Sequence, residues 1–400
     1  MSHDGHALDG VTVLDLSTFV TGGFCSLMLA NQGAEVIKVE RPGVGDDNRH
    51  SGPPFVDGES PYFWTVNYGK RSVELNLKTE EGLAALYDLA EEADVFVQNY
   101  RPGTAEKLRV ADDDIREVNE DVIYCAISAF GQTGPWSRRP GYDLLVQGMS
   151  GIMSVTGEPD RDPVKVGLPQ TDLITGMWAA FGIVTALYRR ALTGEGDYLE
   201  LGMLDATLPW LTKQAGKAFV GEEPERMGTK DPVLAPYQTF ETADGHINVA
   251  CLNQKLWRGL CEAIDRPELA DDERFAENAD RVEHMDALEA ELQAELEQRT
   301  TDEWMEILVE DAGIPAGPVY SVDEALHNEQ TEARGMVTEM EARGKTIPVV
   351  EHPLNYERTE TGFESPPPEL GEHNREVFAE LGYSDDEIDA LADAGVFGSD

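Results

Sequence analysis

The feature that most restricts the fold is an alternation of short β-branched segments with helical segments through the first half of the chain. Strand-like segments rich in Val, Ile and Leu occur at 11–17, 34–40, 71–77, 93–99, 122–130 and 197–203. Helical spacing of apolar residues occupies 21–33, 79–92 and 104–119 between several of them. Strands that alternate with helices form parallel sheets covered on both faces. We therefore expect an α/β fold with a Rossmann-like, mostly parallel sheet.

A change in composition divides the 400-residue chain, which is long enough for more than one buried core. Pro, Gly and charged residues crowd 221–236, and a second irregular crossing follows at 313–321. Between them we expect two strands within 237–251, joined by an Asp-Gly turn, and helices near 253–265, 280–299 and 301–312. The predicted division is a large domain at 1–221, a small α+β domain at 222–320, and a C-terminal segment at 321–400 that returns to the large domain and ends in two short helices.

The net charge restricts the environment and the partners. The chain has 77 Asp and Glu against 31 Lys and Arg, a formal charge of −46. The acids are interleaved along the whole sequence, which favours a protein from a salt-rich cytoplasm, where screening within a few ångströms suppresses self-repulsion. A binder of cationic partners is the alternative, although no separate acidic patch stands out. Nucleic acid is disfavoured as a partner by the same field.

The cysteines and the apolar segments give no sign of a metal centre or a membrane anchor. Cys25, Cys125, Cys251 and Cys261 are far apart and form no CxxC pair, so they are predicted to be buried thiols in a reducing cytosol. The longest apolar run, near 177–188, is shorter than a membrane span. We expect a soluble cytoplasmic protein without a bound metal and without a membrane partner.

Asp172 is an isolated acid before a long apolar segment that is predicted to be a helix ending near Leu192. Asp is a preferred N-cap residue, and its charge suits the positive end of a helix dipole. A cap and a catalytic carboxylate are both consistent with this position.

The first strand-helix-strand unit also suggests a dinucleotide site. Glu40 ends the second strand, where an acid could hold a ribose, but the preceding turn lacks the GxGxxG pattern. A nicotinamide-dependent Rossmann oxidoreductase therefore remains a weak alternative.

Ten segments in order along the chain resemble those of the family III CoA-transferases, a group that includes the α-methylacyl-CoA racemases. They are "LDGVTVLDLS", "GAEVIKVERPGVGDD", "NYGKRSVELNLKTEEG", "QNYRPGTAEKL", "SAFGQTGP", "GYDLLVQGMSG", "TDLITG", "PYQTFETADG", "AGIPAGPV" and "LGEHNREV". The resemblance implies an interlocked homodimer that moves CoA between carboxylic acids. The branch that it resembles handles C4–C5 diacids such as succinate and mesaconate in a halophile.

The resemblance also implies a mechanism. In the family, the Asp at the start of this helix is the nucleophile, and it corresponds to Asp172. A carboxylate there can attack an acyl-CoA thioester and form a mixed anhydride and then an aspartyl-CoA thioester. No prosthetic group is expected, because coenzyme A enters as part of the substrate.

Further site residues are implied in the same way. The expected CoA contacts are Val20, Thr21, Arg41, Leu75, Lys78, Asn99, Tyr100, Arg101 and Lys107. Surface salt bridges are the alternative role for Arg41, Lys78 and Lys107. The substrate pocket is expected to involve Tyr142 and Asp143, with Arg49, Arg138 and Arg139 near a distal carboxylate and Tyr237 and Gln238 in a segment that closes over the site.

Tyr142 favours a transferase over a racemase. The racemase branch has a His at this position, which acts with the downstream Asp as a pair of bases, whereas this chain has Tyr. Proton exchange on both faces of an α-carbon would then lack one base. We therefore expect a CoA-transferase, with an α-methylacyl-CoA racemase of the same fold as the alternative.

Overall fold

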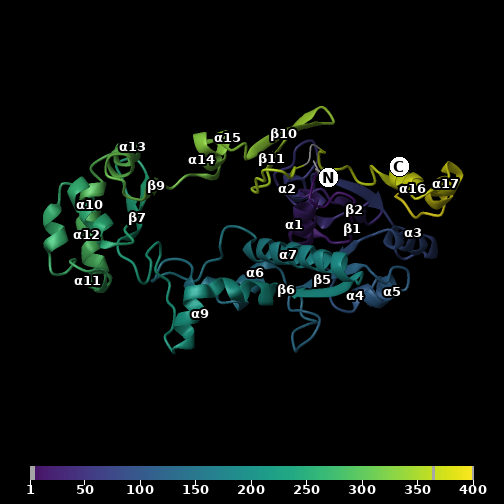
Figure 1. The fold of residues 1–400 in the computed structure, drawn as a ribbon, viewed down its shortest axis with the longest axis horizontal. Helices are drawn as coiled ribbons and strands as arrows, with labels where there is room; N and C mark the ends of the chain where they lie inside the picture. The colour runs from purple at the N-terminus through teal and green to yellow at the C-terminus, as the bar shows by residue number, and fades with distance from the viewer. Residues whose placement is uncertain (1–4, 363–364, 399–400) are drawn as a thin grey trace. The chain divides into compact units, whose positions relative to one another are not determined.

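A computed structural model of the chain describes residues 5–362 and 365–398. The chain divides into two compact units (Figure 1). The first contains residues up to 151, then 166–212 and the chain from 330 on; the second contains 152–165 and 213–329. This grouping assigns 152–165 to the second unit, a segment that the sequence analysis left in the large domain. The domain limits predicted near 222 and 320 remain predictions.

A six-stranded parallel sheet organises the first unit, in the order β3-β2-β1-β4-β5-β6. Its strands are β1 Thr12–Asp15, β2 Glu35–Glu40, β3 Lys70–Glu74, β4 Val95–Gln98, β5 Ile123–Ser128 and β6 Asp197–Gly202. This is the doubly wound strand order, which reverses direction between β1 and β4. The predicted Rossmann-like parallel sheet is therefore confirmed.

Helices cover both faces of this sheet, as the nearly continuous apolar strands require. On one face, Val13 of β1 and Ile123 of β5 pack with α1 (Phe19–Ala30) and α7 (Gln170–Thr193). On the other face, Leu14 and Phe96 pack with α3 (Glu80–Glu91) and the C-terminal α16 (Asn374–Glu380) and α17 (Asp385–Asp393). The end of the chain thus returns to the first unit, where the Asn374 amide oxygen accepts the Glu74 N–H at 2.8 Å.

The other elements of this unit lie around the sheet. They are α2 Pro61–Asn67, α4 Thr104–Leu108, α5 Asp112–Arg116, α6 Asp143–Met149, α8 Met203–Thr207, β10 Val337–Ala342 and β11 Lys345–Val350, with 3-10 turns at Asp47–His50 and Leu208–Leu211. The expected helix over 104–119 is wrong as a single element. Arg109 ends α4 in the left-handed region, with φ 59°, and the chain restarts as α5.

The antiparallel hairpin of β10 and β11 was not predicted from the sequence. Met340, Ile347 and Val349 alternate inward and pack with Phe63 and Trp64 of α2. Pro348 within β11 argues against a strand in the sequence and hides this hairpin.

Helix α7 is the longest helix in the described residues and lies beside α1 (Figure 1). By length and composition it could cross a membrane, a test that the core helix of a globular protein also passes. It is longer than the apolar run that the sequence analysis recognised. Ala179, Ala180, Ile183 and Leu187 bury one of its faces against the sheet, which is the packing of a core helix.

The second unit has its own core. The antiparallel sheet β7-β8-β9 contains Tyr237–Glu241, His246–Ala250 and Ala316–Pro318, and its first two strands form the predicted hairpin around Asp244 and Gly245. Its helices are α9 Thr212–Phe219, α10 Gln254–Ala263, α11 Asn278–Glu283, α12 Met285–Leu296, α13 Thr301–Met305, α14 Val322–His327 and α15 Glu329–Ala333, the first and last of which lie at the unit boundary. Shorter turns occupy Ile152–Val155, Pro267–Asp271 and the π-helical Glu306–Asp311. Cys251 and Cys261 are buried here, and all four cysteines are free.

Candidate active site

A cavity of about 320 Å³ opens at the carboxyl ends of the central strands, within the first unit. Thr18 follows β1, Asn99 follows β4, Ser128 ends β5 and Met203 follows β6, and all four line it. Asp172 is part of the same wall. The cavity therefore lies where the strand order reverses, the place at which ligands bind in open parallel sheets.

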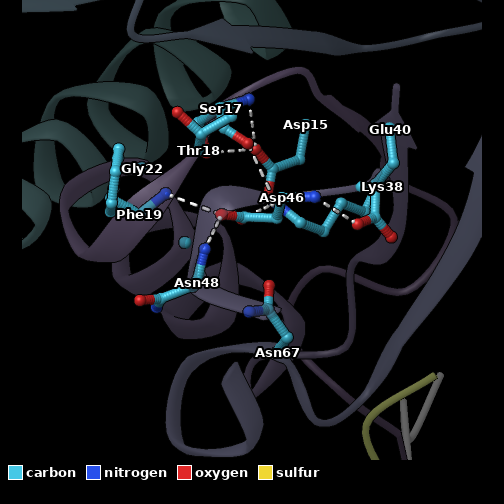
Figure 2. Close-up of polar contacts among 12 residues, drawn as sticks. Asp15, Ser17, Thr18, Phe19, Gly22, Lys38, Glu40, Asp46, Asn48 and Asn67 are labelled. Atoms are coloured by element: carbon cyan, nitrogen blue, oxygen red, sulfur yellow. Dashed lines mark hydrogen bonds and ion pairs between the residues drawn. The ribbon is translucent and has the colours of Figure 1, made fainter. Parts of the chain in front are cut away.

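The turn between β1 and α1 forms one lip of the cavity. A buried polar network holds this turn in place (Figure 2). Phe19 has a φ of 62°, unusual for a residue with a side chain, and its N–H donates to Asp46 Oδ1 at 2.9 Å. Asp46 pairs with the buried Lys38 at 2.8 Å, and Lys38 Nζ also donates to the Ser17 carbonyl at 2.9 Å. These contacts hold the Phe19 backbone in its left-handed conformation.

The same network reaches the centre of the sheet through Asp15. Its carboxylate accepts from the Ser17 and Ser26 hydroxyls, each at 2.5 Å, and lies 3.2 Å from Lys70 Nζ. Burial opposes ionisation, but Lys38, Lys70 and the hydroxyls of Ser17 and Ser26 together outweigh it and lower the pKa of Asp15 to about 2. Asp15, Lys38, Asp46 and Lys70 therefore form a buried charged cluster behind the turn that lines the cavity.

Asp172 is the third residue of α7, because the helix begins at Gln170 after Pro169. Of the two roles considered for Asp172, the helix cap is not formed. Its Oδ1 accepts a hydrogen bond from the hydroxyl of Thr21, in the first turn of α1, and not from an amide of its own helix. Asp172 thus faces the neighbouring helix and the cavity.

Asp143 supplies the cap that Asp172 does not. This first residue of α6 accepts the Thr171 N–H and the Thr171 hydroxyl, both at 2.9 Å, and the Gln147 side-chain amide at 2.8 Å. Asp143 was expected in the acyl pocket. Its carboxylate instead holds the start of α7, and it does not line the cavity.

The electrostatics of Asp172 follow from these neighbours. Burial raises the pKa of Asp172 to about 6; the hydrogen bond from Thr21 opposes this rise, and the charge of Asp143 adds to it. Asp172 lies in the first turn of α7, where the positive end of the helix dipole favours the ionised carboxyl. At pH 7 a group of this pKa is about nine-tenths ionised, so the carboxylate form predominates but is poorly solvated.

The residues expected to contact CoA fall into three groups. Thr21, Asn99, Tyr100 and Arg101 line the cavity, and Asn99 also exchanges two hydrogen bonds with the Thr18 backbone, at 3.0 and 2.7 Å. Val20 lies between the lining residues Phe19 and Thr21 but is not itself in the wall, and Leu75 is buried in the core.

The three remaining candidates lie on the surface. Arg41 pairs with Asp47 at 2.8 Å, and Asp47 lines the cavity. Lys78 and Lys107 are exposed, and neither has a carboxylate within 4.0 Å among residues 5–362 and 365–398. The surface salt bridge considered for these lysines is therefore not formed in the described part of the chain.

The three arginines proposed near a distal carboxylate do not come together. Arg139 lines the cavity, with its guanidinium carbon 4.8 Å from the centre of the Trp136 ring, whereas Arg138 is exposed outside the wall. Arg49 forms a bidentate pair with Glu40 at 2.6 and 2.7 Å and lies over Phe63. Glu40 is thereby occupied as well, with a further bond from Ser72 at 2.6 Å, so it is not free for a ribose.

Tyr142 lines the cavity just before α6 and packs edge-on against Phe19, with ring centres 6.0 Å apart. Tyr237 and Gln238 belong to β7 of the second unit, where Tyr237 is exposed and Gln238 is buried. The lining residues Phe19, Asp47 and Ser137 were not predicted from the sequence. Only Phe19 could have been predicted as a lining residue, because it follows the first strand of the parallel sheet.

Taken together, the parallel sheet and a carboxylate-bearing cavity at its switch point define an α/β enzyme. The crystal structure of a CAIB/BAIF family protein from Brucella suis superposes on this chain with a TM-score of 0.87 and 37% sequence identity, covering 94% of this chain and 100% of that one. The chain therefore has the fold of the CAIB/BAIF family protein.

The sequence profile of CoA-transferase family III matches residues 8–374. A succinyl-CoA:glutarate CoA-transferase of Mus musculus is 39% identical over 393 residues, which cover 97% of this chain and 90% of the relative. A succinyl-CoA:mesaconate CoA-transferase of Haloarcula marismortui is 38% identical over 388 residues, covering 94% and 96%. The chain belongs to CoA-transferase family III and is a CoA-transferase.

Proposed function

We propose that the enzyme transfers CoA from an acyl-CoA to a small dicarboxylic acid through a covalent intermediate on Asp172. The observation that carries this proposal is the setting of Asp172: a carboxylate in the cavity at the switch point, with a pKa of about 6 and no Lys, Arg or His within 4.0 Å in the described chain. A carboxylate without a cationic partner and with little solvation keeps its nucleophilicity.

The first half of the reaction forms the enzyme-bound thioester. An Asp172 oxygen attacks the thioester carbonyl carbon of the donor, the C–S bond breaks, and a mixed anhydride and CoA thiolate result. The thiolate then attacks Cγ of Asp172. The donor acid leaves as a carboxylate that carries the bridging oxygen, and Asp172 becomes an aspartyl-CoA thioester.

The second half repeats these steps in reverse with the acceptor. A carboxylate oxygen of the acceptor attacks Cγ, thiolate leaves, and a second mixed anhydride forms. The thiolate attacks the acceptor's carbonyl carbon, which gives the product acyl-CoA and frees the Asp172 carboxylate. Charge and atoms balance without a metal or a redox cofactor.

For the acids, we propose succinyl-CoA as donor and a C4–C5 diacid such as mesaconate as acceptor. The mouse succinyl-CoA:glutarate and the Haloarcula marismortui succinyl-CoA:mesaconate CoA-transferases support this choice. Arg139 supports it as well, because it lines the cavity with no carboxylate within 4.0 Å among the described residues. Such a guanidinium suits the distal carboxylate of a diacid, and Arg101 in the same wall suits a CoA phosphate.

A panel of acceptor acids tests the proposal. The protein in molar KCl with succinyl-CoA should form new acyl-CoA from mesaconate or glutarate, detected by chromatography. Arg139→Gln should raise KM for the diacid at least tenfold while changing KM for a monocarboxylate of equal length little. Failure to transfer CoA to any diacid would overturn the substrate assignment, and equal KM changes for both acids would remove Arg139 from it.

We also propose that the protein is a homodimer, as the family resemblance implies. Met177, Phe181, Val184, Tyr188 and Leu192 follow one face of α7, and their side chains are 41 to 70% exposed in the single chain. An apolar stripe of this size on a monomer marks an interaction surface. Light scattering should give twice the chain mass, and Phe181→Glu should shift it toward the monomer; a native monomer would contradict the proposal.

The cellular setting that we propose is a salt-rich cytoplasm. The formal charge of −46 is tolerable where salt screens charges over roughly 3 Å.

A further inference from the structure

The contact between α1 and α7 at Asp172 suggests a role for a residue that was expected only to touch CoA. Thr21 is 5% exposed, and its hydroxyl donates a hydrogen bond to Asp172 Oδ1. In the described chain no other hydrogen bond to the Asp172 carboxylate occurs. Oδ1 is therefore occupied, and Oδ2 is the oxygen free to attack.

The close approach of the two helices is built into the sequence. Gly176 lies one turn after Asp172, and a Cβ there would sit 2.8 Å from the Thr21 carbonyl oxygen. Only a residue without a side chain lets α1 come this near to α7. At the other side, the Asp46 carboxylate fixes the start of α1 through the Phe19 N–H (Figure 2). The position of Thr21 is thus set from both directions.

The chemistry of the second step gives this hydroxyl its function. When thiolate attacks Cγ of the mixed anhydride, the C–O double bond to Oδ1 opens and Oδ1 takes the negative charge. Oδ2 leaves with the donor acid. A donor already placed on Oδ1 stabilises this oxyanion more than the neutral carbonyl, which lowers the barrier.

We propose that Thr21 is a catalytic residue whose hydroxyl stabilises the oxyanion on Asp172 Oδ1 during formation and breakdown of the aspartyl-CoA thioester. This inference rests on the proposed function, since it requires Asp172 to be the nucleophile. Thr21 acts twice in each turnover, because the acceptor's attack on Cγ passes through the same kind of intermediate.

The test compares Thr21→Val with Thr21→Ser in a single turnover with succinyl-CoA and no acceptor. Rapid quenching and mass spectrometry follow the aspartyl-CoA thioester on the peptide that contains Asp172. We expect Thr21→Val to form it roughly 100-fold more slowly than the native enzyme, with the succinyl-CoA Kd changed less than about threefold. Thr21→Ser should restore most of the rate.

A matched control separates chemistry from stability. Thr175 is also buried in α7 and donates to the Thr171 carbonyl at 2.6 Å, so Thr175→Val removes a similar hydroxyl that does not contact Asp172. Both valine variants should lower the melting temperature comparably, but only Thr21→Val should slow adduct formation. Native rates in a folded Thr21→Val variant would overturn the inference. Absence of the adduct in the native enzyme would instead overturn the proposed function.

Discussion

At the scale of single residues, Asp172 and its two polar neighbours determine how the site depends on pH. Burial and the Asp143 charge favour the neutral acid, and the Thr21 hydrogen bond favours the anion. The balance lies at a pKa of about 6. In the proposed mechanism the anion attacks the thioester, so protonation would remove the nucleophile.

This balance predicts an acidic limb in the rate. Above pH 6 the carboxylate predominates and kcat/KM for succinyl-CoA should be constant; below pH 6 it should fall about tenfold per pH unit, because one proton blocks the nucleophile. The measurement is initial rate against pH from 4.5 to 8 in molar KCl. A rate that stays flat down to pH 4.5 would mean that Asp172 titrates as an ordinary exposed acid or does not react.

At the scale of elements, the start of α7 depends on a carboxylate from α6. Asp143 accepts the Thr171 N–H, and its charge raises the pKa of the adjacent Asp172. A residue 28 positions upstream thereby both caps the helix and tunes the reactive group.

Replacement of this charge should move the acidic limb. Asp143→Asn removes a like charge near Asp172, so the pKa of Asp172 should fall and the limb should shift to lower pH. Thr171→Val is the control, since it removes one hydrogen bond to Asp143 and keeps the charge. A shift to higher pH in Asp143→Asn, or an equal shift in both variants, would show that the charge of Asp143 has no such effect.

Local patterns determined most of these elements but not their contacts. The strands of the parallel sheet and the hairpin at β7 and β8 follow from apolar spacing and turn residues, which act over a few positions. The hairpin at β10 and β11 was missed because Pro348, beside the buried Ile347, argues against a strand. The bond between Thr21 and Asp172 joins residues 151 apart, and it depends on how α1 packs against α7.

The same limit applies to the candidate site. Resemblance to a family pointed to Asp172 and also to Asn99 and Tyr100, which line the cavity because they follow β4. The sequence could not show that Arg49 pairs with Glu40, nine residues earlier, because the ion pairs of a charged side chain are determined only in the folded chain.

At the scale of the whole molecule, the excess of acids makes stability depend on salt. Lowering KCl from about 1 M to about 0.1 M lengthens the screening distance from roughly 3 to 10 Å and restores repulsion among carboxylates. The melting temperature should therefore fall as KCl is lowered, which differential scanning fluorimetry can follow. A constant melting temperature over this range would contradict the proposed salt-rich setting.

The central claim is that Asp172 carries CoA during turnover, and trapping the adduct tests it most directly. Native enzyme incubated with succinyl-CoA without acceptor, then treated with hydroxylamine and digested, should yield a hydroxamate on Asp172 in the peptide mass spectrum, since hydroxylamine attacks the aspartyl thioester. Asp172→Ala should bind succinyl-CoA but yield no hydroxamate and no transfer. A hydroxamate on another residue, or near-native transfer by folded Asp172→Ala, would contradict the account.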